Sequence, residues 1–398
     1  MPHAVPAGSR LHSLDTLRGF ALLGILLMNI QSFSMPEAAY LNPTAYGDFT
    51  GINRLVWALS HLLADNKFMS IFAMLFGAGI VLFTERLEAR GEDSFRLHYR
   101  RMFWLLVFGL IHAHFIWYGD ILYHYAICGM LLYFARHWPA PRLMALGLML
   151  LFIGWALTAI SQFSISQMTA EMLTELKLAW APPETHIARE IADYTGSWQR
   201  QFARRSESAF TMETLVLLYM IWRLLGLMLI GMALYKQGQF SGSLSSQQLL
   251  RNAVLCIAAG FALTGYGMAY NLTHQFAMMY AYTAGTLFNY VGSVITSLGY
   301  LYLLGGLANK SLLRNSGHRL AQVGRMAFSN YIGQSLICTF IFYGFGLGLF
   351  GAVERWQQLL IVIAVWVLQL AGSGWWLARF RYGPLEWLWR VLTYGRRP

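Results

Sequence analysis

Long apolar stretches recur along almost the whole chain, and they restrict its fold more than any other feature. Most approach the roughly 20 residues that a helix needs to cross a bilayer. We therefore predict an all-α fold, a polytopic transmembrane helical bundle of about ten spans. The predicted spans lie near residues 17–33, 57–84, 102–118, 120–135, 143–165, 213–234, 252–270, 286–308, 327–347 and 356–377.

The composition agrees with a membrane protein. Hydrophobic side chains make up 57% of the 398 residues and charged side chains only 12%, which excludes an ordinary soluble globular domain. We expect the lipid bilayer as a partner and no nucleic acid, because no soluble domain offers a basic face. The three cysteines fall inside apolar stretches and are odd in number, so no disulfide framework follows. The sequence is compatible with either a monomer or a homo-oligomer.

The orientation is predicted from the basic residues, which are enriched in cytoplasmic segments. If the N-terminus is cytoplasmic, 20 of the 29 Lys and Arg residues fall in cytoplasmic segments. Both termini are then inside, and residues 1–398 form one integral-membrane domain. Residues 166–212 become an external loop, either a lid over an external site or a solvated connector. Residues 378–398, rich in Trp and Arg, resemble a cytoplasmic interfacial helix.

The stretch HAHFIWYGDILYHYAIC, residues 112–128, holds the tightest cluster of ionisable groups and lies between two apolar stretches. If Asp120 opens the second helix, its carboxylate can cap that helix. Four-residue spacing then places Asp120, His124 and Cys128 on one face. Ionisable groups inside a bilayer usually pair or line a watered cavity, so a functional cavity around His112 and Asp120 is our first hypothesis. The alternative is an interfacial hairpin whose polar groups meet water and lipid headgroups.

Polar residues in the first predicted span form a second candidate set. Asp15 and Arg18 are three residues apart and could pair at the cytoplasmic surface; the alternative for Arg18 is a positive-inside anchor. Asn29, three turns further along, could donate to a cavity or act as a hydrogen-bonding contact between helices.

Two cations lie beside or inside apolar stretches. Lys67 precedes an apolar stretch, and Arg223 interrupts another. A guanidinium inside a span needs a carboxylate, a carbonyl or water, and Asp120 or Glu213 could supply the carboxylate. A bound anion, such as the phosphates of a cofactor, is the alternative.

A polar helix face is expected near the C-terminus, where Ser329, Asn330, Gln334 and Ser335 are close in sequence. Asn330 and Gln334 are four residues apart and share one face, which suits either a polar pocket or hydrogen bonds between helices. We expect no metal, because the i, i+2 spacing of His112 and His114 at a helix end converges poorly.

Six segments resemble the YeiB family of bacterial inner-membrane proteins, a family of unknown function, and the likeness spans nearly the whole chain. The segments are SLDTLRGFALLGILLMNI, YLNPTAYG, KFMSIFAMLFGAG, GLIHAHFIWYGDILYHYAICG, GRMAFSNYIGQSLICTFIFYGFGLGLFG and FRYGPLEWLWRVLTYGRR. Lys67, His112 and Asp120 fall on family motif positions, whereas His114 and His124 do not. The resemblance implies localisation in the bacterial inner membrane.

The YeiB family is in turn distantly similar to transmembrane acyltransferases, including heparan-α-glucosaminide N-acetyltransferases and glycan O-acetyltransferases. The likeness lies chiefly in Asp15, Arg18 and Gly19 at the first span. It implies transfer of an acyl group, such as acetyl, from cytosolic acyl-CoA to a small-molecule, lipid or glycan acceptor across the membrane.

The leading hypothesis from the sequence is therefore a membrane acyltransferase that uses acyl-CoA as co-substrate. Arg18 and the basic segment 96–101 would attract its phosphates. His112 would act as general base, oriented by Asp120, and Lys67 or Arg223 would stabilise the oxyanion. The alternative is a small-molecule transporter or exporter whose polar path is lined by Asp120, Lys67 and Arg223.

Overall fold

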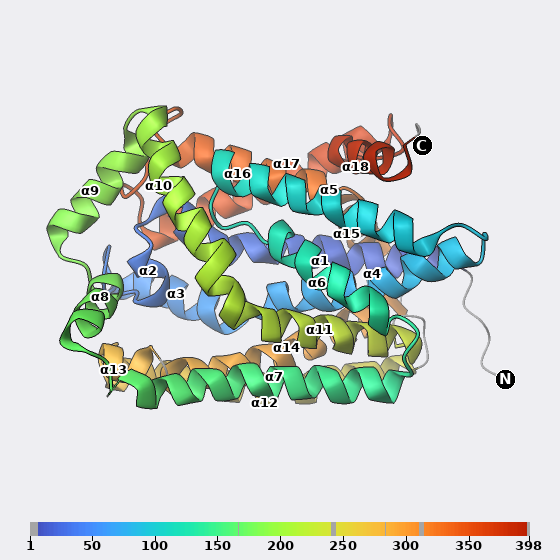
Figure 1. The fold of residues 1–398 in the computed structure, drawn as a ribbon, viewed down its shortest axis with the longest axis horizontal. Coiled ribbons are helices and arrows are strands. Elements are labelled where there is room, and N and C mark those ends of the chain that lie inside the picture. Colours follow the sequence, from blue (N-terminus) through green and yellow to red (C-terminus); the bar gives the residue numbers. More distant parts are fainter. Residues whose placement is uncertain (1–6, 166, 240–243, 283, 310–313, 396–398) are drawn as a thin grey trace.

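The computed structural model describes residues 7–165, 167–239, 244–282, 284–309 and 314–395 (Figure 1). Within these ranges the chain is helical and contains no strand, which confirms the predicted all-α class. Residue 166, the first of the expected external loop, and residues 396–398 of the expected tail lie outside the described residues. The α-helices are α1 Ala7–Ser34, α2 Ala38–Leu41, α3 Gly51–Leu63, α4 Lys67–Glu88, α5 Ser94–Phe115, α6 Leu122–Leu132, α7 Ala140–Ile165, α8 Ala170–Trp180, α9 Glu184–Thr195, α10 Trp198–Thr211, α11 Leu217–Lys236, α12 Ser246–Thr273, α13 Met278–Ala281, α14 Ala284–Asn309, α15 Arg314–Arg325, α16 Ala327–Phe342, α17 Arg355–Leu377 and α18 Pro384–Tyr394.

Seven helical segments among the described residues are long and apolar enough to cross a membrane. They are Ser13–Ser34, Gly51–Glu88, Ala140–Ser161, Leu217–Lys236, Ser246–Thr273, Met278–Ala308 and Arg355–Leu377. Helix α16 has only 16 residues and α6 only 11, so neither reaches the length of a full span by itself. The all-α bundle is thus confirmed, and the count of ten spans stays a prediction.

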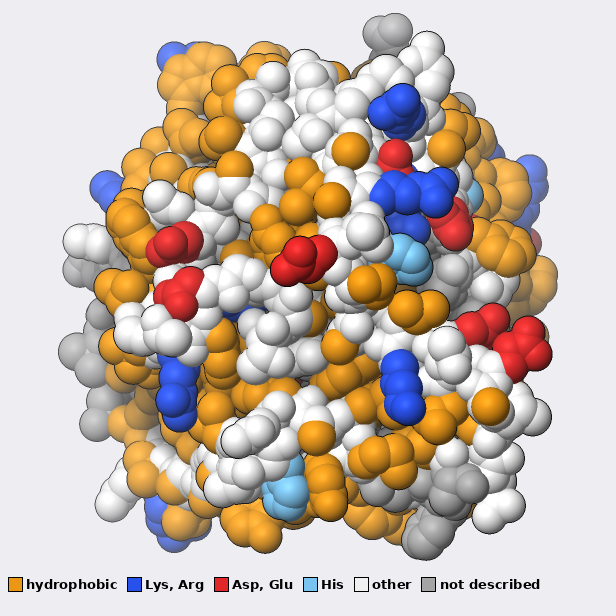
Figure 2. All heavy atoms as spheres, turned by 90° about the vertical axis from the view of Figure 1, so that its left-hand side faces the viewer, with side chains coloured by type: hydrophobic (Ala, Val, Ile, Leu, Met, Phe, Trp, Pro, Cys, Tyr) orange, Lys and Arg blue, Asp and Glu red, His pale blue; other side chains and the backbone are white. Residues whose placement is uncertain are grey.

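Different helices lie at the two ends of the bundle. The start of α1 and helix α18 lie at one end, whereas α8 and α9 lie at the other (Figure 1). This arrangement suits a topology with both termini on one side of the membrane; that this side is the cytoplasm stays a prediction. Seen from the α8 and α9 end, acidic and basic side chains are interspersed with apolar ones (Figure 2).

The predicted second span is broken where its polar residues stand. Helix α3 ends at Leu63 and α4 begins at Lys67, and between them Asn66 adopts a left-handed backbone conformation with φ of 59°. Asparagine tolerates this conformation better than most residues, because its short side chain can bond locally. The break leaves polar backbone and side-chain groups inside the bundle, where they need partners.

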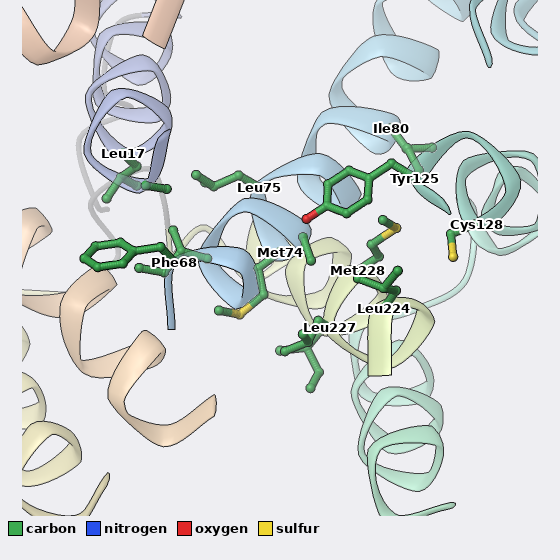
Figure 3. Packing of buried hydrophobic residues seen from close by; sticks show 14 of the residues in the cluster. Leu17, Phe68, Met74, Leu75, Ile80, Tyr125, Cys128, Leu224, Leu227 and Met228 are labelled. Atoms are coloured by element: carbon green, nitrogen blue, oxygen red, sulfur yellow. The ribbon is translucent and has the colours of Figure 1, made fainter. Parts of the chain in front are cut away.

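The central core joins helices that are distant in sequence. Side chains of α1, α4, α6 and α11 pack together in one buried cluster (Figure 3). Helices α4 and α11 approach closely because glycines face the partner backbone: a Cβ on Gly77 would lie 2.0 Å from the carbonyl oxygen of Met228. Likewise, a Cβ on Gly231 would lie 1.9 Å from the carbonyl oxygen of Met74. Small residues at helix crossings are typical of membrane bundles.

The expected external loop is largely helical. Helices α8 and α9 lie on either side of Pro182 and Pro183, which fits the restriction that proline places on the preceding turn. A third helix, α10, continues through a π-helical turn, Met212–Val216, directly into α11. Residues of α10 are therefore tied to a helix of the bundle, and Gln201 and Arg205 are fully buried.

Candidate functional site

The site begins where α5 ends. The chain turns back after Phe115, and the backbone amides of Ile116 and Trp117 both donate to the carbonyl oxygen of His112. Helix α6 then starts at Leu122, and an oxygen of Asp120 accepts the backbone amide of Tyr123 at 2.7 Å. This is the helix-capping contact expected for Asp120, because the first amides of a helix have no partner within it. The cap holds the Asp120 carboxylate in one orientation.

The other carboxylate oxygen of Asp120 is bonded to His112. The distance from Nδ1 of His112 to the carboxylate is 2.8 Å, and both side chains are almost completely buried, at 1% and 2% exposure. An ionised carboxylate only accepts hydrogen bonds, so Nδ1 carries the proton and donates it. Nε2 is then left with a free lone pair. Asp120 thus sets both the tautomer and the direction of the imidazole ring.

Ser335, on α16, is the second hydrogen-bond partner of the His112 ring. Its Oγ lies 2.9 Å from Nε2 of His112, and Ser335 is 1% exposed. With Nε2 unprotonated, the serine hydroxyl is the donor. The three side chains form a buried hydrogen-bonded row, Ser335 to His112 to Asp120. The sequence indicates that Ser335 belongs to a polar helix face but not that this face meets His112, because 223 residues separate the two.

Aromatic side chains enclose the imidazole. The Tyr331 ring lies 5.1 Å from the His112 ring, and the Tyr331 hydroxyl donates to the carbonyl oxygen of Gly119 at 3.3 Å. The Trp117 ring lies 6.2 Å from His112 and stacks on Phe33. Trp117 is 2% exposed, and its indole N–H has no hydrogen-bond partner in the described part of the chain. A buried donor without a partner is costly and calls for an explanation.

Helix α10 and the start of α11 cover this hairpin. Nε of Arg205 donates to the carbonyl oxygen of His114 at 2.7 Å, and the His114 side chain meets Glu213 at 3.3 Å. His124 bonds to the carbonyl oxygen of Met212 at 3.1 Å. His124 thus serves this contact and bonds to neither His112 nor Ser335. The segment expected to be either a lid or a connector packs directly over the candidate site.

The carboxylates of Glu37 and Glu190 link helices α9 and α10 to the segment that follows α1. The backbone amide of Glu37 donates to Glu190 of α9 at 3.0 Å, and Arg204 of α10 lies within 4.0 Å of both carboxylates. Ser208 donates to Glu37. Burial and the neighbouring Glu37 raise the pKa of Glu190 to about 7, since both disfavour the charged form.

Lys67 and Arg223 are hydrogen-bonded to partners other than His112 and Asp120, and their expected action on the His112 site stays a prediction. Nζ of Lys67 donates to Asn289 and to the carbonyl oxygen of His61, each at 2.9 Å. Asn289 in turn donates to Asp65 at 2.6 Å. In the described ranges, no hydrogen bond joins Lys67 or Arg223 to His112 or Asp120.

Of the partners expected for Arg223, the structure shows the carbonyl and not the carboxylate of Asp120 or Glu213. Its guanidinium donates to the carbonyl oxygen of Tyr290 at 2.8 Å and to the hydroxyls of Ser70 and Ser293 at 3.0 and 2.8 Å. It also lies over the Tyr290 ring, 4.5 Å from the centroid, where the ring face attracts a cation. Glu213 pairs with His114 instead. Carbonyl, hydroxyl and aromatic groups together replace the expected ion pair.

The candidates on α1 lie apart from His112. Arg18 and Asp15 form an ion pair at 3.0 Å, as the three-residue spacing predicts, and both are partly exposed. Asn29 is half-buried on α1, and no hydrogen bond among the described residues brings it to His112. The α1 candidates therefore do not belong to the buried row.

Asn330 and Gln334 link helices rather than line a pocket. Asn330 donates to Ser373 at 2.9 Å, and Gln334 donates to Gln369 of α17 at the same distance. Gln369 donates back to the carbonyl oxygen of Asn330 at 2.8 Å. Of the two readings of this polar face, hydrogen bonding between α16 and α17 is the one observed. Its effect is to hold α16, and hence Ser335, in register.

No group of three or more His, Cys, Asp or Glu side chains that could hold a metal ion occurs among the described residues.

Comparison with known proteins places these observations in a family. The structure is that of an all-α protein with several helices able to span a bilayer, and residues 234–396 match a family model described as a protein of unknown function, DUF418. The chain is 33% identical to the uncharacterized protein YeiB of Escherichia coli strain K12, over 96% of this chain and 95% of that one. It is also 33% identical to the uncharacterized protein YxaH of Bacillus subtilis strain 168, over 97% and 94%. The chain belongs to the YeiB family.

Proposed function

We propose that the chain is an inner-membrane acyltransferase that moves an acyl group, such as acetyl, from cytosolic acyl-CoA to an acceptor on the other side of the membrane. The observation that carries this proposal is the buried row of Ser335, His112 and Asp120. Acyl transfer to a hydroxyl or an amine requires a base for the proton of the attacking group, and histidine is the residue most often used.

The geometry at His112 suits this task. Nε2 faces a hydroxyl oxygen at 2.9 Å, within the range of about 2.6–3.2 Å expected for a general base and its partner. Asp120 holds the imidazole in the tautomer that leaves Nε2 free and would stabilise the imidazolium once the proton has moved. The burial of all three side chains excludes bulk water, which strengthens electrostatic effects in the site and limits hydrolysis of the donor.

Basic side chains at the other end of α5 support a donor site. Arg101 stacks on the ring of Trp389 in α18, 4.0 Å from its centroid, and on Phe83 at 4.6 Å. The positive-inside prediction places this end in the cytoplasm, where a basic mouth would attract the phosphates of CoA. Arg101 and His112 are eleven residues apart on one helix, or about 16 Å at 1.5 Å per residue. A bound acyl-CoA would therefore lie along α5, with its thioester directed toward His112.

The acceptor is proposed as a small molecule, a glycan or a lipid that offers a hydroxyl or an amine. The relatives come from bacteria, and the helices that could span a bilayer support a membrane location. The inner membrane is the proposed location because it brings cytosolic acyl-CoA and extracytoplasmic acceptors to opposite faces of one protein.

A transporter is the second candidate, and the broken helix between α3 and α4 favours it. Discontinuous helices with charged groups at the break are frequent at substrate sites of transporters. Here the break brings together Asp65, Lys67 and Asn289. The predicted path through Asp120 is not continuous with this break, since the two hydrogen-bonded networks are separate among the described residues.

Binding of acetyl-CoA to the purified protein tests the proposal. Calorimetry in detergent should give saturable binding by wild type, weaker binding by Arg101→Gln, and unchanged binding by Lys236→Gln, a control at the same end of the bundle. His112→Ala should still bind, because the base contacts the reacting group rather than the CoA phosphates. If no acyl-CoA binds to well-folded protein, the acyltransferase proposal fails and the transporter becomes the better candidate.

A further inference from the structure

We propose that Ser335 is the nucleophile of the reaction and carries the acyl group as a serine ester between donor and acceptor. The inference rests on the proposed acyl transfer and deepens it. A base acting directly on the acceptor would require only His112 and Asp120. The structure instead has a serine hydroxyl in the position that an attacking hydroxyl would occupy.

The first support is the geometry of the row. The distances are 2.9 Å from Oγ of Ser335 to Nε2 of His112 and 2.8 Å from Nδ1 of His112 to Asp120. A nucleophile bonded to a base, and a base oriented by a third group, is the arrangement by which serine is activated in unrelated folds. Such arrangements are recognised by geometry and not by the order of the residues in the chain.

The second support is the Trp117 indole. Its N–H is a buried donor that has no partner in the described part of the chain, and its ring lies 6.2 Å from that of His112. Acyl transfer builds negative charge on the carbonyl oxygen, and a preorganised N–H donor at that position lowers the barrier. We assign this donor to the carbonyl oxygen of an acyl group on Ser335, because Trp117 and Ser335 both lie beside the His112 ring.

The third support is the depth of Ser335 in the bundle. Ser335 is eight residues from the start of α16 at Ala327 and seven from its end at Phe342. At 1.5 Å per residue these are about 12 and 10 Å. A serine ester at this depth would let the donor leave from one face before the acceptor arrives from the other. Donor and acceptor then need not be bound together.

The proposed reaction has two steps, acylation of Ser335 by the donor and transfer of the acyl group from Ser335 to the acceptor. In the first, Oγ of Ser335 attacks the thioester carbonyl and its proton moves to Nε2 of His112; the carbon–sulfur bond breaks, and the sulfur takes that proton and leaves as CoA thiol. In the second, His112 takes a proton from the acceptor hydroxyl or amine, which attacks the ester carbonyl. The bond to Oγ breaks, and His112 returns the proton to Ser335.

The test uses full-length protein in detergent, acetyl-CoA as the probe, and an acid quench after brief mixing. Peptide mass spectrometry should find one acetyl group on Ser335 in the wild type. Thr339→Val is the matched control, because Thr339 lies one turn further along α16 and is equally buried but has no imidazole partner; it should keep the acetyl group. Ser335→Ala should carry no acetyl group, and its rate of CoA release from acetyl-CoA should be at least 100-fold lower than that of the wild type.

Ser335→Cys keeps a nucleophile and guards against a folding defect in the alanine variant. It should form a thioester, which neutral hydroxylamine cleaves, whereas the serine ester of the wild type should resist. If Ser335→Ala releases CoA as fast as the wild type and no acetyl group is found on Ser335, the nucleophile proposal is overturned while acyl transfer stands. If folded wild type neither binds nor turns over any acyl-CoA, both proposals are overturned.

Discussion

Asp120 accepts the Nδ1–H of His112 at 2.8 Å with one carboxylate oxygen while the other caps α6 through the amide of Tyr123. One side chain thus joins the start of a helix to the tautomer of a buried imidazole. The cap is satisfied equally well by Asn and Asp, but only an ionised carboxylate obliges Nδ1 to hold the proton.

Asp120→Asn should therefore reduce activity while leaving the stability of the fold nearly unchanged. The amide can donate to Nδ1, which moves the imidazole proton to Nε2 and removes the acceptor for the Ser335 hydroxyl. We expect release of CoA from acetyl-CoA to fall by about 10²- to 10⁴-fold, the usual contribution of a general base. Thermal unfolding followed in detergent should change little. Wild-type turnover by this variant would contradict the assigned role of Asp120.

The contact between Glu190 and Glu37 should make the stability of helices α9 and α10 depend on pH. The pKa of Glu190 is raised from 4.5 to about 7 in the folded protein. Between these values the folded state holds a proton that the unfolded state has lost, so stability should fall as the pH rises from about 4.5 to 7 and level off above it. The change should be on the order of a few kcal/mol.

Hydrogen exchange of α10 across this pH window measures that change. Glu190→Gln should abolish the pH dependence, since the amide cannot titrate. Glu207→Gln is the control, because Glu207 is 73% exposed and should leave the dependence as in the wild type. An α10 whose protection rises with pH would show that the sign is wrong.

Asp65 is the carboxylate of the network that contains Lys67. It accepts from Asn289 at 2.6 Å and meets His61 at 3.3 Å, and the described residues offer Lys67 and Arg223 no carboxylate within 4 Å. Asp65→Asn should lower the free energy of unfolding by about 1–3 kcal/mol, because the amide offers one acceptor oxygen where the carboxylate offers two, and a buried partner is left unsatisfied. Thermal denaturation in detergent checks this value, and an unchanged midpoint would show that the two cations do not depend on Asp65.

Glu386 connects the C-terminal helix to α16. Its carboxylate accepts the backbone amides of Phe328 and Ser329 at 2.7 and 3.0 Å, and so caps the helix that carries Ser335. Glu386→Ala should cost about 0.5–2 kcal/mol, as for loss of other N-caps, and should make α18 more accessible to protease. Glu92→Ala, at the same end of the bundle but away from α16, should have neither effect. Equal proteolysis of the two variants would argue against the cap.

The parts of the site that the sequence predicts are local ones. His112 and Asp120 are eight residues apart on a single hairpin, and Asp15 and Arg18 are one helical turn apart, so helix geometry alone relates them. The break at Asn66 falls where Asp65, Asn66 and Lys67 interrupt an apolar stretch, and this signal is local as well. These relationships depend only on the chain near each residue.

The remaining parts depend on which helices pack together, and periodicity does not contain that information. Ser335 reaches His112 across 223 residues. Arg223 finds carbonyl and hydroxyl partners on α4 and α14, where charge matching suggests Asp120 or Glu213. Asn330 and Gln334 bond to α17, a choice between pocket and helix contact that their spacing leaves open. The Trp117 donor gives no signal in the sequence, because an indole in an apolar stretch normally packs in the core.

The central claim is that His112 acts as the base in acyl transfer from acyl-CoA. The most direct measurement is release of CoA from acetyl-CoA by the purified protein reconstituted in lipid nanodiscs, with His112→Ala and wild type compared at equal thermal stability. We predict measurable turnover by the wild type and a loss of at least 10²-fold in His112→Ala, as expected for removal of a general base. Equal release of CoA by the two proteins, or none by a wild type that is folded and exposed to several acyl-CoA chain lengths, would contradict it.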